Sequence, residues 1–320
     1  MIDTNSPESF HLSSEENQKV FKEEVIPNIV QLYDFSSSNA PTVSLTGGLP
    51  GAGKSALVNE MLKENPKRDT FIANSDELRP FHPQFKEAVE LYGVKAGMAV
   101  HNDATIFSEK LIEYAQDKKA NFIIDSTLKD PEKTEKLIDS LQNNHYDVKV
   151  TMIAVNEFES IHGIFNRYAE QYKDNPKTAR FVNPKFIAIG KENIPKSAEV
   201  IEKKNIKEFK IIDRDHKLLY NSRENPKTSA KATIQEKTDL KNWDKSKIDK
   251  LVENWNRVVA KLENVKAPQT VQESAKNIKK DLIDQLKSLQ KNKPKFNEQK
   301  RNQVLEKLQK GKEKNKGIER

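Results

Sequence analysis

Apolar residues follow two different spacings along the first two-thirds of this chain. Short runs rich in β-branched and aromatic residues indicate strands at residues 42–46, 70–73, 121–125, 147–155, 209–213 and 218–220. Between them, apolar positions recur every three or four residues. They predict helices over about 13–34 and 97–118, from about 131, over 157–173 and after 184. Strands that alternate with helices favour a mostly parallel sheet flanked by helices, so the sequence predicts an α/β fold.

The last third of the chain carries only the helical spacing. A first apolar stripe comprises Trp243, Ile248, Leu251, Trp255, Val258, Val259 and Leu262. After a break at Pro268, a second stripe comprises Val271, Ala275, Ile278, Leu282, Leu286 and Leu289, and a short third one Val304, Leu305 and Leu308. We therefore predict a C-terminal α-helical extension of two or three amphipathic helices.

The charge of the chain changes sign where this extension begins. Residues 1–225 carry 30 Lys and Arg against 35 Asp and Glu, a balance of −5, whereas residues 226–320 carry 25 against 13, a balance of +12. The shift predicts two domains, residues 1–225 and a basic extension of residues 226–320. We interpret the extension as a solvated Lys-rich appendage. Its charge also permits binding to nucleic acid or to an anionic membrane surface.

Composition also restricts the chemistry and the location. The chain has no cysteine, which excludes disulfides, thiolate metal sites and a cysteine nucleophile. No apolar run approaches 18 residues, and the first ten residues, MIDTNSPESF, lack the basic and hydrophobic regions of an export signal. We therefore expect no transmembrane segment and a cytoplasmic protein.

The sequence GLPGAGKS, residues 48–55, matches the phosphate-binding loop pattern G-x-x-x-x-G-K-[ST]. A strand-like run precedes it and a helical stretch follows, so backbone amides and a helix N-terminus would face the phosphates. Lys54 would reach the β- and γ-phosphates, and the Ser55 hydroxyl would ligate Mg²⁺. The predicted nucleotide site consists of Gly48, Leu49, Pro50, Gly51, Ala52, Gly53, Lys54 and Ser55.

Two acidic residues follow other predicted strands. Asp76 lies just beyond residues 70–73, and Asp125 ends the run Phe122-Ile123-Ile124. Ligands of α/β sheets bind at the carboxyl ends of the strands, so both carboxylates are candidates for a phosphotransferase site. An aspartate after a strand is as often a helix N-cap, and that alternative stays open here.

Several motifs in order give the chain a resemblance to the zeta toxins, the P-loop kinases of epsilon/zeta toxin–antitoxin systems. They are GLPGAGKS, NSDELRPFHPQF, IIDSTLKDP, FNRYAEQYKDNPKTAR and IIDRDHKLLYNS, which together span about two-thirds of the chain. The resemblance implies ATP-dependent phosphorylation of UDP-N-acetylglucosamine at the 3′-hydroxyl of its amino sugar, which blocks use of this cell-wall precursor. It also implies a small helical antitoxin of the epsilon type as a partner.

The resemblance assigns catalytic roles by position. Asp76 falls on the carboxylate that accepts the proton of the sugar hydroxyl, and Lys54 on the P-loop lysine. Arg167 and Arg180 match two arginines that embrace the γ-phosphate, a role that suits a guanidinium fork. Without the family, Arg167 could pair with a glutamate of its own helix, and Arg180 could be a solvated loop residue. His82 is interpreted as structural.

The resemblance also assigns acceptor-binding positions and shows where this chain departs from the family. Glu109, Asp125 and Thr127 fall on positions that hold the sugar nucleotide. Residue by residue, Glu109 could instead lie on a solvated helix face, and Thr127 could be a helix N-cap or part of a turn. The family usually reads Glu-Gly-Thr where this chain has Asp125-Ser126-Thr127, and Lys129 replaces an arginine. These departures leave another acceptor open, such as a different sugar nucleotide or NAD.

A second class of function is a polynucleotide kinase that uses the basic extension to bind nucleic acid. The net charge of −5 over residues 1–225 is unfavourable for a phosphate backbone, so the sequence favours the small-molecule kinase.

Overall fold

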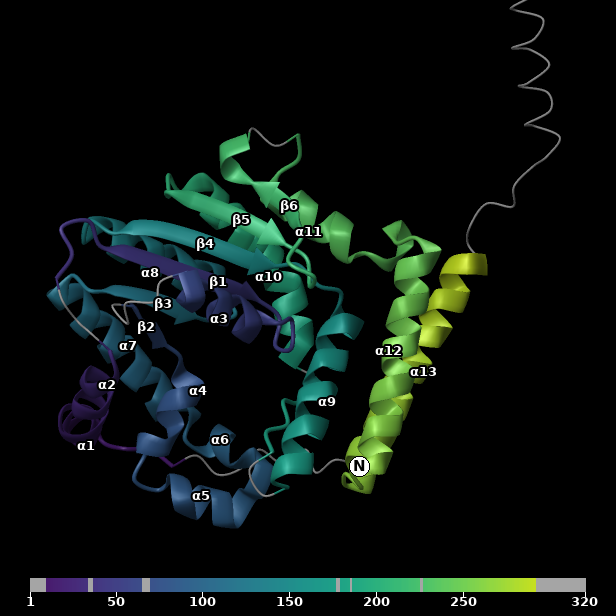
Figure 1. Cartoon of the computed structure of the whole chain (residues 1–320), viewed down its shortest axis with the longest axis horizontal. Coiled ribbons are helices and arrows are strands. Elements are labelled where there is room, and N and C mark those ends of the chain that lie inside the picture. The colour runs from purple at the N-terminus through teal and green to yellow at the C-terminus, as the bar shows by residue number, and fades with distance from the viewer. Residues whose placement is uncertain are drawn as a thin grey trace, which may run out of the picture. The chain divides into compact units, whose positions relative to one another are not determined.

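The strand-like runs of the sequence form one six-stranded sheet in the order β2-β3-β1-β4-β5-β6 (Figure 1). This computed structural model describes residues 10–33, 37–64, 70–176, 179–184, 186–224 and 227–291. The first five strands of this order pair in parallel, and β6 pairs antiparallel to β5. The strands are β1 Thr42–Gly48, β2 Thr70–Ala73, β3 Asn121–Asp125, β4 Asp147–Ile153, β5 Glu208–Ile212 and β6 Leu218–Asn221. The predicted α/β fold with a mostly parallel sheet is confirmed.

Helices flank the sheet and begin with a continuous helical run at residues 14–32. Up to the sixth strand the helical elements are α1 Ser14–Val20, η1 Phe21–Val25, α2 Ile26–Leu32, α3 Lys54–Glu64, α4 Ser75–Leu78, η2 Arg79–Phe81, α5 Phe85–Tyr92, η3 Gly93–Lys95, α6 Ala96–Ala99, α7 His101–Lys118, α8 Pro131–Asn143, α9 Glu157–Asp174 and α10 Phe186–Lys203. After it come η4 Ser222–Glu224, α11 Ala230–Thr238, η5 Leu240–Asn242, α12 Lys245–Asn264 and α13 Gln269–Lys291.

The parallel register brings the functional segments to one edge of the sheet. Val43 and Leu45 of the central strand β1 are fully buried, as expected for a strand covered on both faces. Thr46 is paired with Asp125 of β3, and Gly48 with Ile153 of β4. The carboxyl ends of β1, β3 and β4 therefore lie side by side, and the loops that leave them share one edge.

The C-terminal helical extension predicted from the last third of the sequence is present, and α12 packs against α9. The indole of Trp255 is fully buried and its Nε1 donates a hydrogen bond to the Phe158 carbonyl oxygen, 3.2 Å away. The Trp255 ring also lies about 6 Å from the rings of His162 and Phe165. The first apolar stripe of the extension therefore covers the helix that carries Arg167.

Contacts divide the chain into one compact unit of residues 1–280 and a second of residues 281–320. The charge boundary near residue 225 lies within the first unit, because α11 contacts α10 and α12 contacts α9. The third apolar stripe, at residues 304–308, lies outside the described residues. Within the part of the chain that the structure describes, no helix is both long enough and apolar enough to cross a membrane.

Candidate active site

The predicted phosphate-binding loop connects β1 to α3, as its sequence context requires. Gly48, Gly51 and Gly53 have φ values of 135°, 78° and 110°, a backbone region that side chains disfavour. The glycines let the loop turn back above the end of β1, and the Gly48 amide donates to the Thr127 carbonyl oxygen at 3.1 Å. Helix α3 then begins at Lys54, so its N-terminus lies directly after the loop.

Helices α9 and α10 both contact the phosphate-binding loop. The Ser160 hydroxyl donates to the Pro50 carbonyl oxygen at 2.6 Å. One turn later α9 has a glycine, Gly163, and a methyl group there would overlap the Gly51 carbonyl. On α10, Gly190 leaves room for the Leu49 side chain. The loop conformation therefore depends on these two helices as well as on its own glycines.

Lys54 is the cation at the centre of the site. Its Nζ donates to the carbonyl oxygens of Gly48 and Leu49 at 3.0 and 3.1 Å. Burial is the main cause that lowers the Lys54 pKa to about 8. The Asp125 and Asp76 carboxylates oppose this shift, and Arg167 adds to it. Because its surroundings disfavour the charged form, this ammonium group gains from a nearby anion.

Asp125 is fixed through both carboxylate oxygens. The Thr46 hydroxyl donates a hydrogen bond to Oδ1 at 3.0 Å, and the side-chain amide of Asn74 donates one to Oδ2 at 3.1 Å. The N-cap of the following helix α8 is Asp130, whose side chain accepts from the Lys133 amide. The N-cap interpretation therefore holds neither for Asp125 nor for Thr127, and Asp125 lies at the end of its strand facing the loop lysine.

Asp76 is likewise not a helix cap. Asn74 caps α4, and its side-chain oxygen accepts a hydrogen bond from the backbone N–H of Asp76 at 2.9 Å. The Asp76 carboxylate lies between two arginines. Oδ1 is 2.5 Å from Nη2 of Arg79, and Oδ2 is 3.4 Å from Nη1 of Arg180. About 39% of the Asp76 side chain remains exposed, so a substrate hydroxyl can reach it.

Arg167 extends from the middle of α9 toward the same group of charges. Burial is the main cause that lowers its pKa; the neighbouring Arg180 lowers it further, and Asp76 and Asp125 raise it. Its Nε is buried and has no hydrogen-bond partner among the described residues. A buried guanidinium edge without a partner is costly, so this position is suited to an oxyanion.

The structure thus brings together five of the residues that the sequence singled out: Lys54, Asp76, Asp125, Arg167 and Arg180. Glu109 is exposed on α7 and makes no ion pair or hydrogen bond with any described residue. Ser55 is an exposed residue in the first turn of α3.

Sequence reasoning missed three polar residues that organise this site: Thr46, Asn74 and Arg79. Thr46 shows no signal of its own, because a threonine within a strand is ordinary. Asn74 could have been identified as the N-cap before a short helix, and Arg79 as a partner for Asp76 at i,i+3 spacing.

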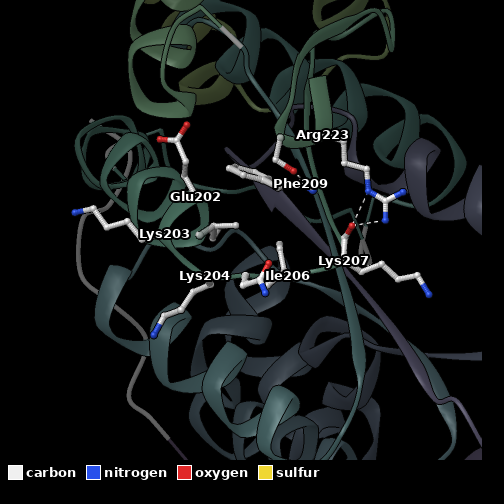
Figure 2. A pocket seen from close by; sticks show the side chains of 10 residues that line it. Glu202, Lys203, Lys204, Ile206, Lys207, Phe209 and Arg223 are labelled. Atoms are coloured by element: carbon white, nitrogen blue, oxygen red, sulfur yellow. Dashed lines mark hydrogen bonds between the residues drawn. The ribbon is translucent and has the colours of Figure 1, made fainter. Parts of the chain in front are cut away.

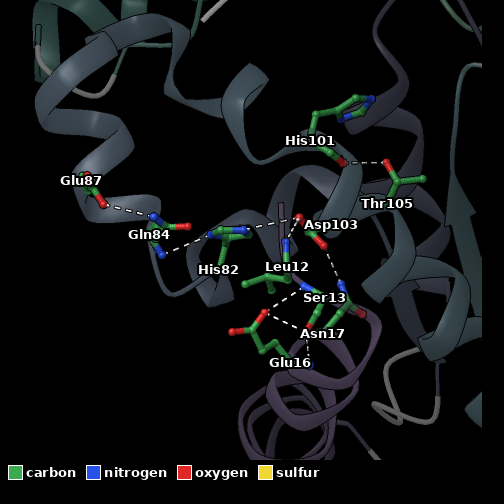
Figure 3. Close-up of polar contacts among 10 residues, drawn as sticks. All are labelled: Leu12, Ser13, Glu16, Asn17, His82, Gln84, Glu87, His101, Asp103 and Thr105. Carbon is green, nitrogen blue, oxygen red and sulfur yellow. Dashed lines mark hydrogen bonds and ion pairs between the residues drawn. The ribbon is translucent and has the colours of Figure 1, made fainter. Parts of the chain in front are cut away.

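His82 is buried and lies in a polar network with Asp103 and residues of the N-terminal helical run (Figure 3). Its Nδ1 accepts a hydrogen bond from the backbone N–H of Gln84 at 3.1 Å. Its Nε2 faces the Asp103 carboxylate at 3.5 Å. Asp103 also accepts the Leu12 amide and the Asn17 side-chain amide. The network ties the N-terminal helical run to the segment that follows Asp76, which is a structural role for His82.

A separate basic cavity of about 510 Å³ lies at the amino end of β5, whereas the phosphate-binding loop follows the carboxyl end of β1. Figure 2 shows the side chains that line this cavity. Its lysines already have carboxylate partners: Lys204 pairs with Glu135 and Asp139, and Lys203 with Glu199. Arg223 donates to the Lys207 carbonyl oxygen. Lys207 pairs with Asp147, so every lysine that lines the cavity has a carboxylate partner, and we do not propose a second anion site here.

Comparison with known proteins places this arrangement in a family. The zeta toxin family model matches residues 30–225. The chain is 28% identical over 226 residues to toxin zeta of Streptococcus agalactiae, covering 70% of this chain and 78% of that one. It is 29% identical over 201 residues to toxin PezT of Streptococcus pneumoniae serotype 4, covering 62% and 79%.

Solved structures share the fold. The structure of the PezAT chromosomal toxin–antitoxin system of Streptococcus pneumoniae matches with a TM-score of 0.65 at 24% identity, covering 79% of this chain and 98% of that one. An AvrRxo1-ORF1:-ORF2 complex with ATP matches with a TM-score of 0.51 at 14% identity, covering 79% and 85%. With the family match over most of the chain, these findings show that the protein belongs to the zeta toxin family, a family of kinase-type phosphotransferases.

Proposed function

We propose that this protein is an ATP-dependent toxin kinase that phosphorylates UDP-N-acetylglucosamine at the 3′-hydroxyl of the amino sugar. The observation that carries the proposal is the position of Asp76. Its half-exposed carboxylate lies among Arg79, Arg180 and Arg167 on the strand edge that carries the phosphate-binding loop. A proton acceptor beside several cations matches the requirements of phosphoryl transfer to a hydroxyl.

ATP is the proposed phosphoryl donor. The loop glycines and the N-terminus of α3 offer backbone amides to its phosphates, and Lys54 would turn from the loop carbonyls toward the β- and γ-phosphates. A protein of the same fold has been solved with ATP, which supports this choice.

Mg²⁺ is the proposed metal, and the residues present fit it. The available donors are oxygens, the Ser55 hydroxyl and the Asp125 carboxylate, and Mg²⁺ prefers oxygen ligands. The described residues contain no cluster of three or more His, Asp or Glu side chains that could hold a metal alone. Mg²⁺ would therefore bind together with nucleotide phosphates, and it would neutralise charge on them.

In the proposed reaction, Asp76 accepts the proton of the sugar 3′-hydroxyl while the hydroxyl oxygen forms a bond to the γ-phosphorus. The bond from that phosphorus to the bridging oxygen breaks, and ADP leaves. Lys54, Arg167 and Arg180 offset the negative charge on the moving phosphoryl group. The Asp76 and Asp125 carboxylates influence the charges of Lys54 and Arg167, and Arg180 pairs with Asp76, which supports these roles.

The sugar nucleotide is proposed to contact Glu109, Asp125 and Thr127. Both oxygens of Asp125 already accept hydrogen bonds from Thr46 and Asn74. The shorter aspartate also reaches less far than the family's glutamate. We therefore expect weaker binding of UDP-N-acetylglucosamine than in relatives that have Glu-Gly at this position.

A small helical antitoxin is the proposed partner, and it would cover the nucleotide site. The support is that a similar solved structure is described as a toxin–antitoxin system. A kinase that consumes a cell-wall precursor would act in the cytoplasm. Expression of this protein alone should arrest bacterial growth, and co-expression of the antitoxin should relieve the arrest.

The basic extension, with a net charge of +12 over residues 226–320, favours a polynucleotide kinase as the second candidate. One experiment separates the two functions. The full-length protein is given radiolabelled ATP and a panel of UDP-sugars, NAD and oligonucleotides. Label in UDP-N-acetylglucosamine supports our proposal; label only in oligonucleotides, with salt-sensitive binding, supports the alternative.

A further inference from the structure

Two arginines contact Asp76, and the structure distinguishes them. Nη2 of Arg79 lies 2.5 Å from the carboxylate, and only 16% of the Arg79 side chain is exposed. Nη1 of Arg180 lies 3.4 Å away, and 42% of the Arg180 side chain is exposed. The shorter, more buried pair is the firmer one, because water competes less for it.

Arg79 follows α4 in the η2 turn, three residues after Asp76, and its guanidinium lies against Gly97 of α6. A methyl group at Gly97 would be 2.5 Å from Nη1 and 3.1 Å from Cζ of Arg79. Unlike the loop glycines, Gly97 does not have a positive φ. Its backbone therefore does not require glycine, and a helical glycine is about 1 kcal/mol less favourable than alanine. Because Gly97 has no side chain, the Arg79 guanidinium can lie directly against its backbone, which explains the glycine at this position.

The Nε of Arg79, on the same guanidinium edge as Nη2, is also informative. It is buried and has no hydrogen-bond partner among the described residues. Asp76 is the carboxylate with which Arg79 forms an ion pair in the described part of the chain. Contact with Gly97 and the pair with Asp76 together therefore determine where the guanidinium lies.

We propose that Arg79, seated on Gly97, is a positioning residue that fixes the Asp76 carboxylate for the acceptor hydroxyl. This inference rests on the proposed kinase function. The two arginines would then have different roles. Arg79 holds the Asp76 carboxylate, and the more exposed and more distant Arg180 can turn to the γ-phosphate. Without Arg79, Arg180 would have to bind both the Asp76 carboxylate and the γ-phosphate.

Gly97→Ala tests the inference without removing a charged group. The new methyl meets the far end of a flexible side chain, so the guanidinium must move while the backbone can stay. The helix preference of alanine offsets part of the cost of displacing the Arg79–Asp76 pair, so the variant should unfold cooperatively near the wild-type temperature. A displacement of about 1 Å near a reacting group can cost about 100-fold in rate, so we expect kcat to fall about 10- to 100-fold. The Kd for ATP should not change.

A double-mutant cycle shows whether the effect passes through Arg79. Arg79→Gln alone should lower kcat by a similar factor. Arg79→Lys should restore little of it, since the lysine ammonium is one bond closer to the backbone than Nη2 and would reach Oδ1 less well. In the Arg79→Gln background, Gly97→Ala should then have no further effect. Equal losses from Gly97→Ala in both backgrounds would overturn the inference, and so would wild-type kcat in Arg79→Gln.

A second readout separates this inference from the proposed function. If the wild type transfers phosphate to no acceptor, the kinase proposal fails. Urea unfolding of wild type, Arg79→Gln, Asp76→Asn and the double variant still measures the coupling between the two side chains. Non-additive changes in the midpoint support the fixed pair, and additive changes contradict it.

Discussion

Replacing Gly163 by alanine should displace the phosphate-binding loop without removing any proposed catalytic side chain. The added methyl would lie 3.0 Å from the Gly51 carbonyl carbon, with the carbonyl oxygen nearer still, and 2.7 Å from Nη2 of Arg214. A carbon and a carbonyl oxygen normally approach no closer than about 3.3 Å. The loop and α9 must therefore separate by about 1 Å.

The expected magnitude has two parts. Overpacking of this kind costs about 1–3 kcal/mol, and exchanging a helical glycine for alanine returns about 1 kcal/mol, so the free energy of unfolding should fall by about 0–2 kcal/mol. A shift of about 1 Å breaks at least one loop amide contact to a phosphate. A hydrogen bond to a charged group contributes about 1.5–3 kcal/mol, so the Kd for ATP should rise about 10- to 100-fold.

Isothermal titration with ATP and urea unfolding measure both parts, and Gly190→Ala is the matched control. Gly190 is also a helical glycine against the loop, but its methyl would meet the end of the Leu49 side chain, 2.6 Å away, which can rotate aside. We expect the control to bind ATP within about threefold of the wild type. A folded Gly163→Ala variant that binds ATP as the wild type does would refute this reasoning.

The remaining predictions concern charge and acceptor choice. Lys54→Ala should abolish phosphoryl transfer while unfolding stays cooperative, and turnover near the wild-type rate would contradict the loop assignment. Because burial lowers the Lys54 pKa to about 8, the ammonium group loses its proton as the pH rises through 8. The Kd of free protein for ATP should therefore rise between pH 8 and 10, and a flat profile would argue against this role. Burial also lowers the His162 pKa to about 4 from an ordinary 6.5, so stability should be lost as the pH falls from 6.5 to 4, by about 3 kcal/mol in total. His162→Phe should flatten that dependence in urea unfolding, and an unchanged slope would exclude His162 as its source. The double change Asp125→Glu with Ser126→Gly should lower KM for UDP-N-acetylglucosamine and leave KM for ATP unchanged; no improvement would count against that acceptor.

Periodicity in the sequence predicted most of the fold. The runs at residues 70–73 and 121–125 are strands with the same bounds, and the stripe at 157–173 is α9 to within one residue. These segments were predictable because buried parallel strands are continuously apolar and an amphipathic helix repeats every 3.6 residues. The apolar stripe with Leu251 and Trp255 also predicted α12. Its partner could not be predicted, since packing against α9 depends on the three-dimensional arrangement.

The candidate site was less predictable than the fold. Local sequence identified the loop from Gly48 to Ser55, because strand, glycines and helix are adjacent in the chain. The contacts of Asp125 with Thr46 and Asn74 join three strand ends, and nothing in the order of residues indicates which ends meet. The same holds for Arg79 and Gly97, which are 18 positions apart and meet only after α5 and η3 have turned the chain.

The most direct test of the central claim is label transfer from ATP, radiolabelled at the γ-phosphate, to UDP-N-acetylglucosamine by wild type and Asp76→Asn. Labelled UDP-N-acetylglucosamine is expected with the wild type. With Asp76→Asn we expect a rate about 10²–10⁴-fold lower at an unchanged Kd for ATP, because the proton acceptor is lost while the groups proposed to bind the phosphates remain. Transfer at the wild-type rate by Asp76→Asn, or an equal loss of ATP binding and turnover, would contradict the role assigned to this carboxylate.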